Sequence, residues 1–129
     1  MHQLEERPAH GSTAAAISNA AVRVLSDFTG RGPTKARTTI AHDLVVIMLA
    51  DTMTKGERTL VASGQGELVL TTRHRYQEAM RDDLVGSVEM LTERKVIAFM
   101  SGNHIDPDMA AEVFVLEPQN AESAGSDPA

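Results

Sequence analysis

The sequence predicts an α+β fold with the element order α-β-β-α-β-β, in which a four-stranded antiparallel sheet carries its helices on one face. Two long segments, 12–29 and 54–92, repeat apolar residues at helical spacing, and each is followed by two short runs suited to strands. At 129 residues the chain fits one domain. We place it at 12–117 and expect disordered tails at 1–11 and 118–129, which are rich in small and polar residues and lack periodicity.

The first helix is expected to begin after Ser12 and Thr13, both good N-cap residues. Its apolar residues recur at intervals of three and four and end before Gly30, a typical helix stop. They are Ile17, Ala21, Val24, Leu25 and Phe28. This spacing predicts an amphipathic helix with one buried face.

The next two runs predict antiparallel strands at 35–41 and 44–50, joined by a tight turn at His42 and Asp43. The second strand, "LVVIMLA", is apolar without polar alternation. Such a strand is covered on both faces by its own chain, or on one face by a partner.

The segment 54–92 predicts helix, with Thr54 and Glu57 forming a capping box at its start. "SGQG" at 63–66 contains two glycines, so we expect a kink or break there. At about 100° per residue, one buried arc contains Val69, Tyr76, Met80, Leu84, Val88 and Leu91.

Two further strands are expected at 95–101 and 110–117, on either side of "GNHIDPD" (102–108). The core between the layers must be aliphatic, because aromatic residues make up 3% of the chain. The seven Met residues fit gap-filling in such a core better than an adaptable binding surface, which is the alternative.

Composition restricts the classes of function. The formal net charge is −6. Setting aside the residues near the two ends of the chain, Glu5, Glu6, Glu117, Glu122, Asp127 and the opposing Arg7, leaves 13 acidic and 11 basic residues. We therefore expect no general nucleic-acid binding, which needs clustered cations. Without Cys there is no disulfide or thiolate site. No apolar run of about 18 residues and no secretory signal is present, so we expect a soluble cytoplasmic protein.

The loop "GRGPTKAR" at 30–37 is the first candidate site. Arg31, Thr34, Lys35 and Arg37 combine three cations and a hydroxyl with two flexible glycines, a composition suited to a small anion. It is not a P-loop, because the lysine precedes a strand and the glycine spacing differs. The alternatives are an ordinary solvated loop and a contact with an acidic protein partner.

The second candidate is "GNHIDPD", with Asn103, His104, Asp106 and Asp108 as ligand-binding residues. Imidazole and carboxylate groups bind divalent metals or transfer protons. A metal would need a further ligand, for which His42, Asp43 and His74 are the candidates. The alternative is a strand-joining turn that Pro107 begins and Asn103 and Asp106 stabilise. We assign no metal site, cofactor or catalytic residue, since no complete set is present.

Four stretches together resemble the MpsC-like family of small bacterial proteins: "ISNAAVRVLSDFTGRGPTKART", "DLVVIMLADTMTKGERTLV", "YQEAMRDDLVGSVEMLTERKVIAF" and "SGNHIDPDMAAEVFVLEP". The resemblance covers about 17–118. Its most specific pieces are "GRGPTKAR", "QEAMRDDLV" and "NHIDPD". The sequence departs from the family at "ASGQGE" (62–67), where members tend to continue one helix.

The family is named after a component of a sodium-translocating, membrane-potential-generating system whose membrane proteins are linked to ion transport and inorganic-carbon supply. The resemblance implies a soluble accessory protein and carries over no catalytic residue. We therefore expect a non-enzymatic binding module, a homodimer that contacts a membrane-protein partner at the inner face of the membrane. The competing hypothesis is a small-anion or metal site, or an enzyme, in which Lys35 and Arg37 meet His104, Asp106 and Asp108.

Overall fold

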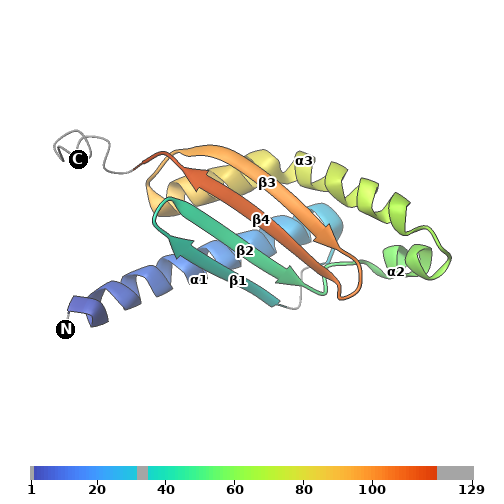
Figure 1. The fold of residues 1–129 in the computed structure, drawn as a ribbon, viewed down its shortest axis with the longest axis horizontal. Helices are drawn as coiled ribbons and strands as arrows, with labels where there is room; N and C mark the ends of the chain where they lie inside the picture. The colour runs from blue at the N-terminus through green and yellow to red at the C-terminus, as the bar shows by residue number, and fades with distance from the viewer. Residues whose placement is uncertain (1, 32–34, 119–129) are drawn as a thin grey trace.

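The computed structural model describes residues 2–31 and 35–118. Over these residues the chain forms three helices and one four-stranded antiparallel sheet, which confirms the α+β class (Figure 1). The predicted second helix is two helices, so the element order is α-β-β-α-α-β-β. The elements are α1 (His2–Thr29), β1 (Lys35–Ala41), β2 (Leu44–Ala50), α2 (Lys55–Ala62), α3 (Gly66–Thr92), β3 (Val96–His104) and β4 (Met109–Leu116).

The sheet has the strand order β1-β2-β4-β3, so the two hairpins join through β2 and β4. Both predicted strands of the first hairpin are confirmed at 35–41 and 44–50. Its turn places His42 at φ 55°, a left-handed conformation in which histidine is enriched. Arg94 donates to the His42 carbonyl and the Asp43 carboxylate, and thereby fixes this turn to the start of β3.

Helices α1 and α3 both cover the same face of the sheet (Figure 1). The alternation of the strands explains the single core: Val45, Ile47 and Leu49 of β2 point toward the helices and are at most 1% exposed. The helices contribute Ile17, Ala21, Leu25, Met80, Leu84 and Val88 to the same cluster. We call this side of the sheet the covered face.

The helical segment breaks where the glycines predict it. Thr54 caps α2 in the predicted capping box, with its side chain accepting from the Glu57 N–H while the Glu57 carboxylate accepts from the Thr54 N–H. Gly64 then takes φ 85°, and a Cβ on Gly66 would lie 3.2 Å from Ile105 Cδ1. Glycine at these two positions thus allows the reversal and the close approach of α3 to the β3–β4 turn.

Three boundaries or burial assignments differ from expectation. Helix α1 begins at His2, within the expected 1–11 tail, where "QLEER" contains good helix formers, and it continues through Pro8 and Gly11 despite their low helix propensity. Strand β3 extends to His104, so "GNH" is strand and not loop. Tyr76 is 40% exposed at the edge of the predicted arc, whereas its neighbour Gln77 is buried. The expected 118–129 tail lies outside the described residues after Pro118.

Candidate functional site

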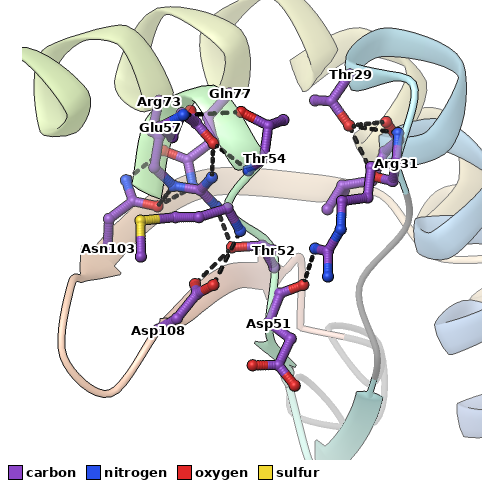
Figure 2. Close-up of polar contacts among 12 residues, drawn as sticks. Thr29, Arg31, Asp51, Thr52, Thr54, Glu57, Arg73, Gln77, Asn103 and Asp108 are labelled. Atoms are coloured by element: carbon purple, nitrogen blue, oxygen red, sulfur yellow. Dashed lines mark hydrogen bonds and ion pairs between the residues drawn. The ribbon is translucent and has the colours of Figure 1, made fainter. Parts of the chain in front are cut away.

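Buried polar side chains gather where the covered face meets α2, α3 and the end of β2 (Figure 2). They form one hydrogen-bonded group, which we call the polar cluster. Its members are Thr52, Glu57, Arg73, Gln77, Ser101, Asn103, Asp108 and Glu112. Its members come from the loop after β2, α2, α3, β3, the β3–β4 turn and β4, so the cluster links elements distant in sequence.

Arg73 lies at the centre of the polar cluster, with its side chain 11% exposed. Its guanidinium donates to Asn103 Oδ1 at 3.1 Å, to Glu57 Oε1 at 3.3 Å and to the Thr52 hydroxyl. Glu57 Oε2 is buried and has no hydrogen-bond partner among the described residues. Arg73 therefore serves to neutralise buried carboxylates and join α2 to the sheet, because its three nitrogens are all engaged inside the protein.

Asp108 fixes the β3–β4 turn to the end of β2. Its carboxylate accepts from the Thr52 hydroxyl at 3.0 Å and from the Met53 N–H at 2.9 Å, and its carbonyl accepts from the Asp51 N–H. Every one of these contacts is internal. Asp108 thus acts here as an acceptor for the backbone of residues 51–53.

Glu112 is 1% exposed on β4, on the covered face. Its two oxygens accept from the Ser101 hydroxyl and, at 3.0 Å, from Gln77 Nε2. Burial raises the pKa of Glu112 to about 6, and the hydrogen bonds from Ser101 and Gln77 and the charge of Arg73 partly oppose this. The carboxyl therefore changes protonation close to neutral pH.

A small cavity adjoins Glu112, Gln77, Arg73 and Thr52 on one side and Leu25 on the other. Its volume is about 20 Å³, which accommodates roughly one water molecule. A substrate or cofactor needs a site of several hundred Å³. The polar cluster is thus a closed network with room for a bridging water.

The residues predicted from "GRGPTKAR" are spread over two environments. Arg31 donates to the Asp51 carbonyl, and Thr34 lies outside the described residues. Lys35 and Arg37 lie on β1, on the side of the sheet opposite the covered face, as the burial alternation of the strand shows. Arg31 is therefore separated in direction from the other two cations.

The residues predicted from "GNHIDPD" also diverge. Asn103 points inward and exchanges hydrogen bonds with Gln77, at 2.8 and 3.1 Å. His104 lies on the opposite side, with Nδ1 2.8 Å from the Pro107 carbonyl oxygen. Asp106 is exposed in the turn. The segment thus divides between the polar cluster, the sheet surface and the turn.

Strand register gives the separation of the two candidate segments. Lys35 pairs with Ala50, Ala50 with Met109, and Met109 with His104, so these residues form one row across the sheet. Three strand spacings of about 4.8 Å separate the ends of this row by roughly 14 Å. A single small ligand cannot contact Lys35 and His104 at this distance. Among the described residues, no group of His, Cys, Asp or Glu is arranged to hold a metal ion.

Sequence reasoning missed Arg73, Gln77 and Glu112. The sequence pattern that could have revealed Gln77 and Glu112 was a polar residue at an inward-facing position. Gln77 lies within the apolar arc of α3, and Glu112 occupies one of the inward-facing positions of β4. The other candidate ligands are solvated or engaged elsewhere. His74 is 62% exposed beside Glu78, and Asp43 binds Arg94.

In Figure 1 the side of the sheet opposite the covered face is toward the viewer, and no helix of the described residues lies over it. We call it the open face. Its residues are Lys35, Arg37, Thr39 and Ala41 of β1, Leu44, Val46, Met48 and Ala50 of β2, Met109, Ala111, Val113 and Val115 of β4, and Ala98, Met100, Gly102 and His104 of β3. The expectation that β2 is covered on both faces by its own chain is therefore wrong for the described residues, and coverage of this face by a partner stays a prediction.

The open face is apolar at its centre. Leu44, Met48 and Met100 are 41%, 37% and 52% exposed, and Ile97 is an exposed extra residue at a bulge in the edge strand β3. The described strands place no acidic side chain on this face, and its Lys and Arg side chains, Lys35 and Arg37, lie on the other edge strand. Contiguous apolar surface of this kind marks an interaction site.

Comparison with known proteins identifies the family. The family model described as "Na+-translocating membrane potential-generating system (MpsC)" matches residues 9–118, most of the chain. The chain belongs to the MpsC family. The comparisons with curated proteins and with solved structures gave no match.

Membership in the MpsC family confirms the resemblance read from the sequence and connects the chain with a membrane system by name. Within the described residues, no helix has both the length and the apolar character needed to cross a membrane.

Methionine use in this MpsC-family chain differs from the core role expected from composition. Met53 and Met80 are buried, but Met48, Met100 and Met109 lie on the open face, and Met90 is 72% exposed on α3. Methionine adapts its shape to irregular partners and is common on binding surfaces. Its position here favours the alternative interpretation, an adaptable binding surface.

Proposed function

We propose that this chain is a non-enzymatic accessory protein of a Na+-translocating, membrane-potential-generating system, and that it acts by binding other proteins. It works as a homodimer at the cytoplasmic face of the membrane, peripheral to a membrane-protein partner. The family match to residues 9–118 supports the connection with this system.

The observation that carries the proposal is the contrast between the two sides of the sheet. On the covered face, the charged groups are bound to one another around a cavity of about 20 Å³. On the open face, apolar side chains of adjacent strands are exposed to solvent. The first arrangement stabilises the fold, whereas the second gains free energy when another protein covers it.

The competing small-ligand hypothesis has less support. Lys35 and His104 lie at opposite edges of the sheet, and Asn103 and Asp108 are hydrogen-bonded inside the polar cluster. The charge of the open face is also too small for nucleic acid, since its two cations lie on one edge strand.

Recovery of partners from native cells tests the proposal. A tagged chain should recover a membrane protein in stoichiometric amount, and Met48→Asp should reduce the recovery more than about tenfold, because a charge is costly at an apolar interface. Met90→Asp is the matched control, since Met90 is exposed on α3, away from the open face. Equal recovery by both variants, or no protein recovered by the unaltered chain, would contradict the proposal.

A further inference from the structure

We infer that the open face binds a second copy of this chain, in a face-to-face dimer whose two-fold axis lies between the sheets and runs parallel to the strands. This inference rests on the proposed function, because it assigns the open face to the homodimer and leaves the membrane-protein partner to another surface of the dimer. It is carried by the distribution of charge over the sheet and its turns.

Cations lie on one edge strand of the open face, and a carboxylate lies in the turn after the other edge strand, at the same end of the sheet. Lys35 and Arg37 lie on edge strand β1. Strand β3 forms the other edge, and the turn that follows it carries the exposed carboxylate of Asp106. None of these three side chains forms an ion pair within the described part of the chain.

A two-fold axis parallel to the strands places β1 of one copy over β3 of the other and keeps the ends of the sheet in register. Because Lys35 and His104 share one row, Lys35 of each copy then lies over His104 of the other, with Asp106 just beyond. A two-fold axis across the strands would instead set β1 over β1 and Lys35 over Ala41, where the nearest carboxylate, Asp43, already pairs with Arg94. The charges therefore select the first arrangement.

The apolar centre fits the same arrangement. Both sheets would meet through Val46, Met48, Ala111 and Val113, which lie on the central strands β2 and β4. Sheets that pack face to face keep their strands within about 30° of each other, as this axis requires. In an isologous dimer the same surface patch of both copies is in contact, so like charges at its centre would repel. The described central strands β2 and β4 place no charged side chain on the open face.

The area of the open face is close to what a specific dimer needs. Four strands about 4.8 Å apart and seven residues of about 3.3 Å each give a face of roughly 20 by 23 Å. Contact between two such faces buries about 900 Å² in total, without counting the protruding side chains and the adjoining turns. A specific interface buries at least roughly 1,000 Å². We therefore expect a dimer that dissociates on dilution.

The two segments that the sequence singles out acquire a common role in this dimer. Within one chain, "GRGPTKAR" and "GNHIDPD" end at opposite edges of the sheet. Between two copies, Lys35 of one segment meets His104 and Asp106 of the other, twice, across the two-fold axis, while Arg37 lies over Gly102.

Sedimentation equilibrium of the purified full chain between about 1 and 200 µM tests the inference. The unaltered chain should approach twice the mass of the monomer at high concentration. Met48→Asp should weaken dimerisation at least about 100-fold with an unchanged circular dichroism spectrum, because it buries two like charges. Met90→Asp should dimerise like the unaltered chain.

A charge swap tests the orientation with side chains that are exposed in the monomer. Lys35→Glu should raise the dissociation constant about tenfold, and adding Asp106→Lys should restore it to within about twofold. A double variant as weak as Lys35→Glu would overturn this two-fold arrangement. A dimer unaffected by Met48→Asp would overturn the choice of surface.

The outcome also separates this inference from the proposed function. A chain that is monomeric at every concentration, yet recovers a membrane protein that Met48→Asp loses, overturns the dimer in both the inference and the proposed function, and supports the accessory role alone. A dimer broken by Met48→Asp in a chain that recovers no other protein supports the inference and contradicts the accessory function.

Discussion

At the scale of single residues, Glu112 combines deep burial with a charge. It lies on a central strand, 1% exposed, and its carboxylate accepts two side-chain hydrogen bonds from Ser101 and Gln77. These bonds and Arg73 do not fully offset the loss of hydration, so its pKa is raised from 4.5 to about 6. The ionised form is therefore less favourable in the folded chain than in the unfolded chain.

The sign of the resulting pH dependence follows from this shift. Below pH 4.5 Glu112 is protonated in both states, whereas ionisation between about pH 4.5 and 6 favours the unfolded state. The shift of about 1.5 units corresponds to roughly 2 kcal/mol, lost as the pH rises. Glu112→Gln should remove this loss, since the amide can accept from Gln77 and donate to Ser101.

Urea unfolding of Glu112→Gln and of the unaltered chain at pH 4.5 and pH 7.5 measures this effect. From pH 4.5 to pH 7.5, the free energy of unfolding of the unaltered chain should fall by about 2 kcal/mol relative to that of Glu112→Gln. Glu78→Gln is the control, because Glu78 is 60% exposed on α3. A stability difference that stays constant with pH would contradict the assignment.

At the scale of elements, α2 is a short helix held at two places. It packs against α3 beyond the end of the sheet (Figure 1), and it is fixed by the Thr54 capping box and the contact of Glu57 with Arg73. Eight residues form too short a helix to be stable on their own. We therefore expect α2 to open locally without unfolding the sheet.

Hydrogen exchange of Thr54→Ala tests the independence of α2. Loss of the cap should lower the stability of α2 by about 1 kcal/mol and speed exchange at 55–62 about fivefold. The sheet should exchange at an unchanged rate. Thr59→Ala is the control, because the Thr59 hydroxyl is exposed and bonds only to the Lys55 carbonyl. Equal acceleration in β2 and α2 would show that they open as one unit.

Local patterns in the sequence predicted the elements better than their tertiary contacts. The β1–β2 hairpin, the capping box at Thr54 and the break at 63–66 each depend on neighbouring residues, and all three are confirmed. The polar cluster joins Arg73 to Asn103 and Gln77 to Glu112, positions 30 and 35 residues apart, which no local periodicity reveals. The 2–11 part of α1 was missed because Pro8 and Gly11 weaken the helical signal.

At the scale of the whole molecule, the sheet divides two kinds of surface. One side is covered by α1 and α3 and contains the core and the polar cluster. The other side presents an apolar surface with cations at one edge and a carboxylate in the turn after the other. Lys35 and His104 lie at opposite ends of one row across the sheet, so "GRGPTKAR" and "GNHIDPD" do not form one pocket within a chain. In the inferred dimer, "GRGPTKAR" of one copy lies next to "GNHIDPD" of the other.

Photo-crosslinking in native cells tests most directly whether the open face is covered by protein. A photoreactive phenylalanine analogue at position 48 should give a discrete crosslinked product, of twice the chain mass for a second copy or larger for a membrane-protein partner. The same analogue at position 90, which is 72% exposed on α3, should give little product. Strong crosslinking at position 90 with none at position 48 would contradict the assignment of the open face as the binding surface.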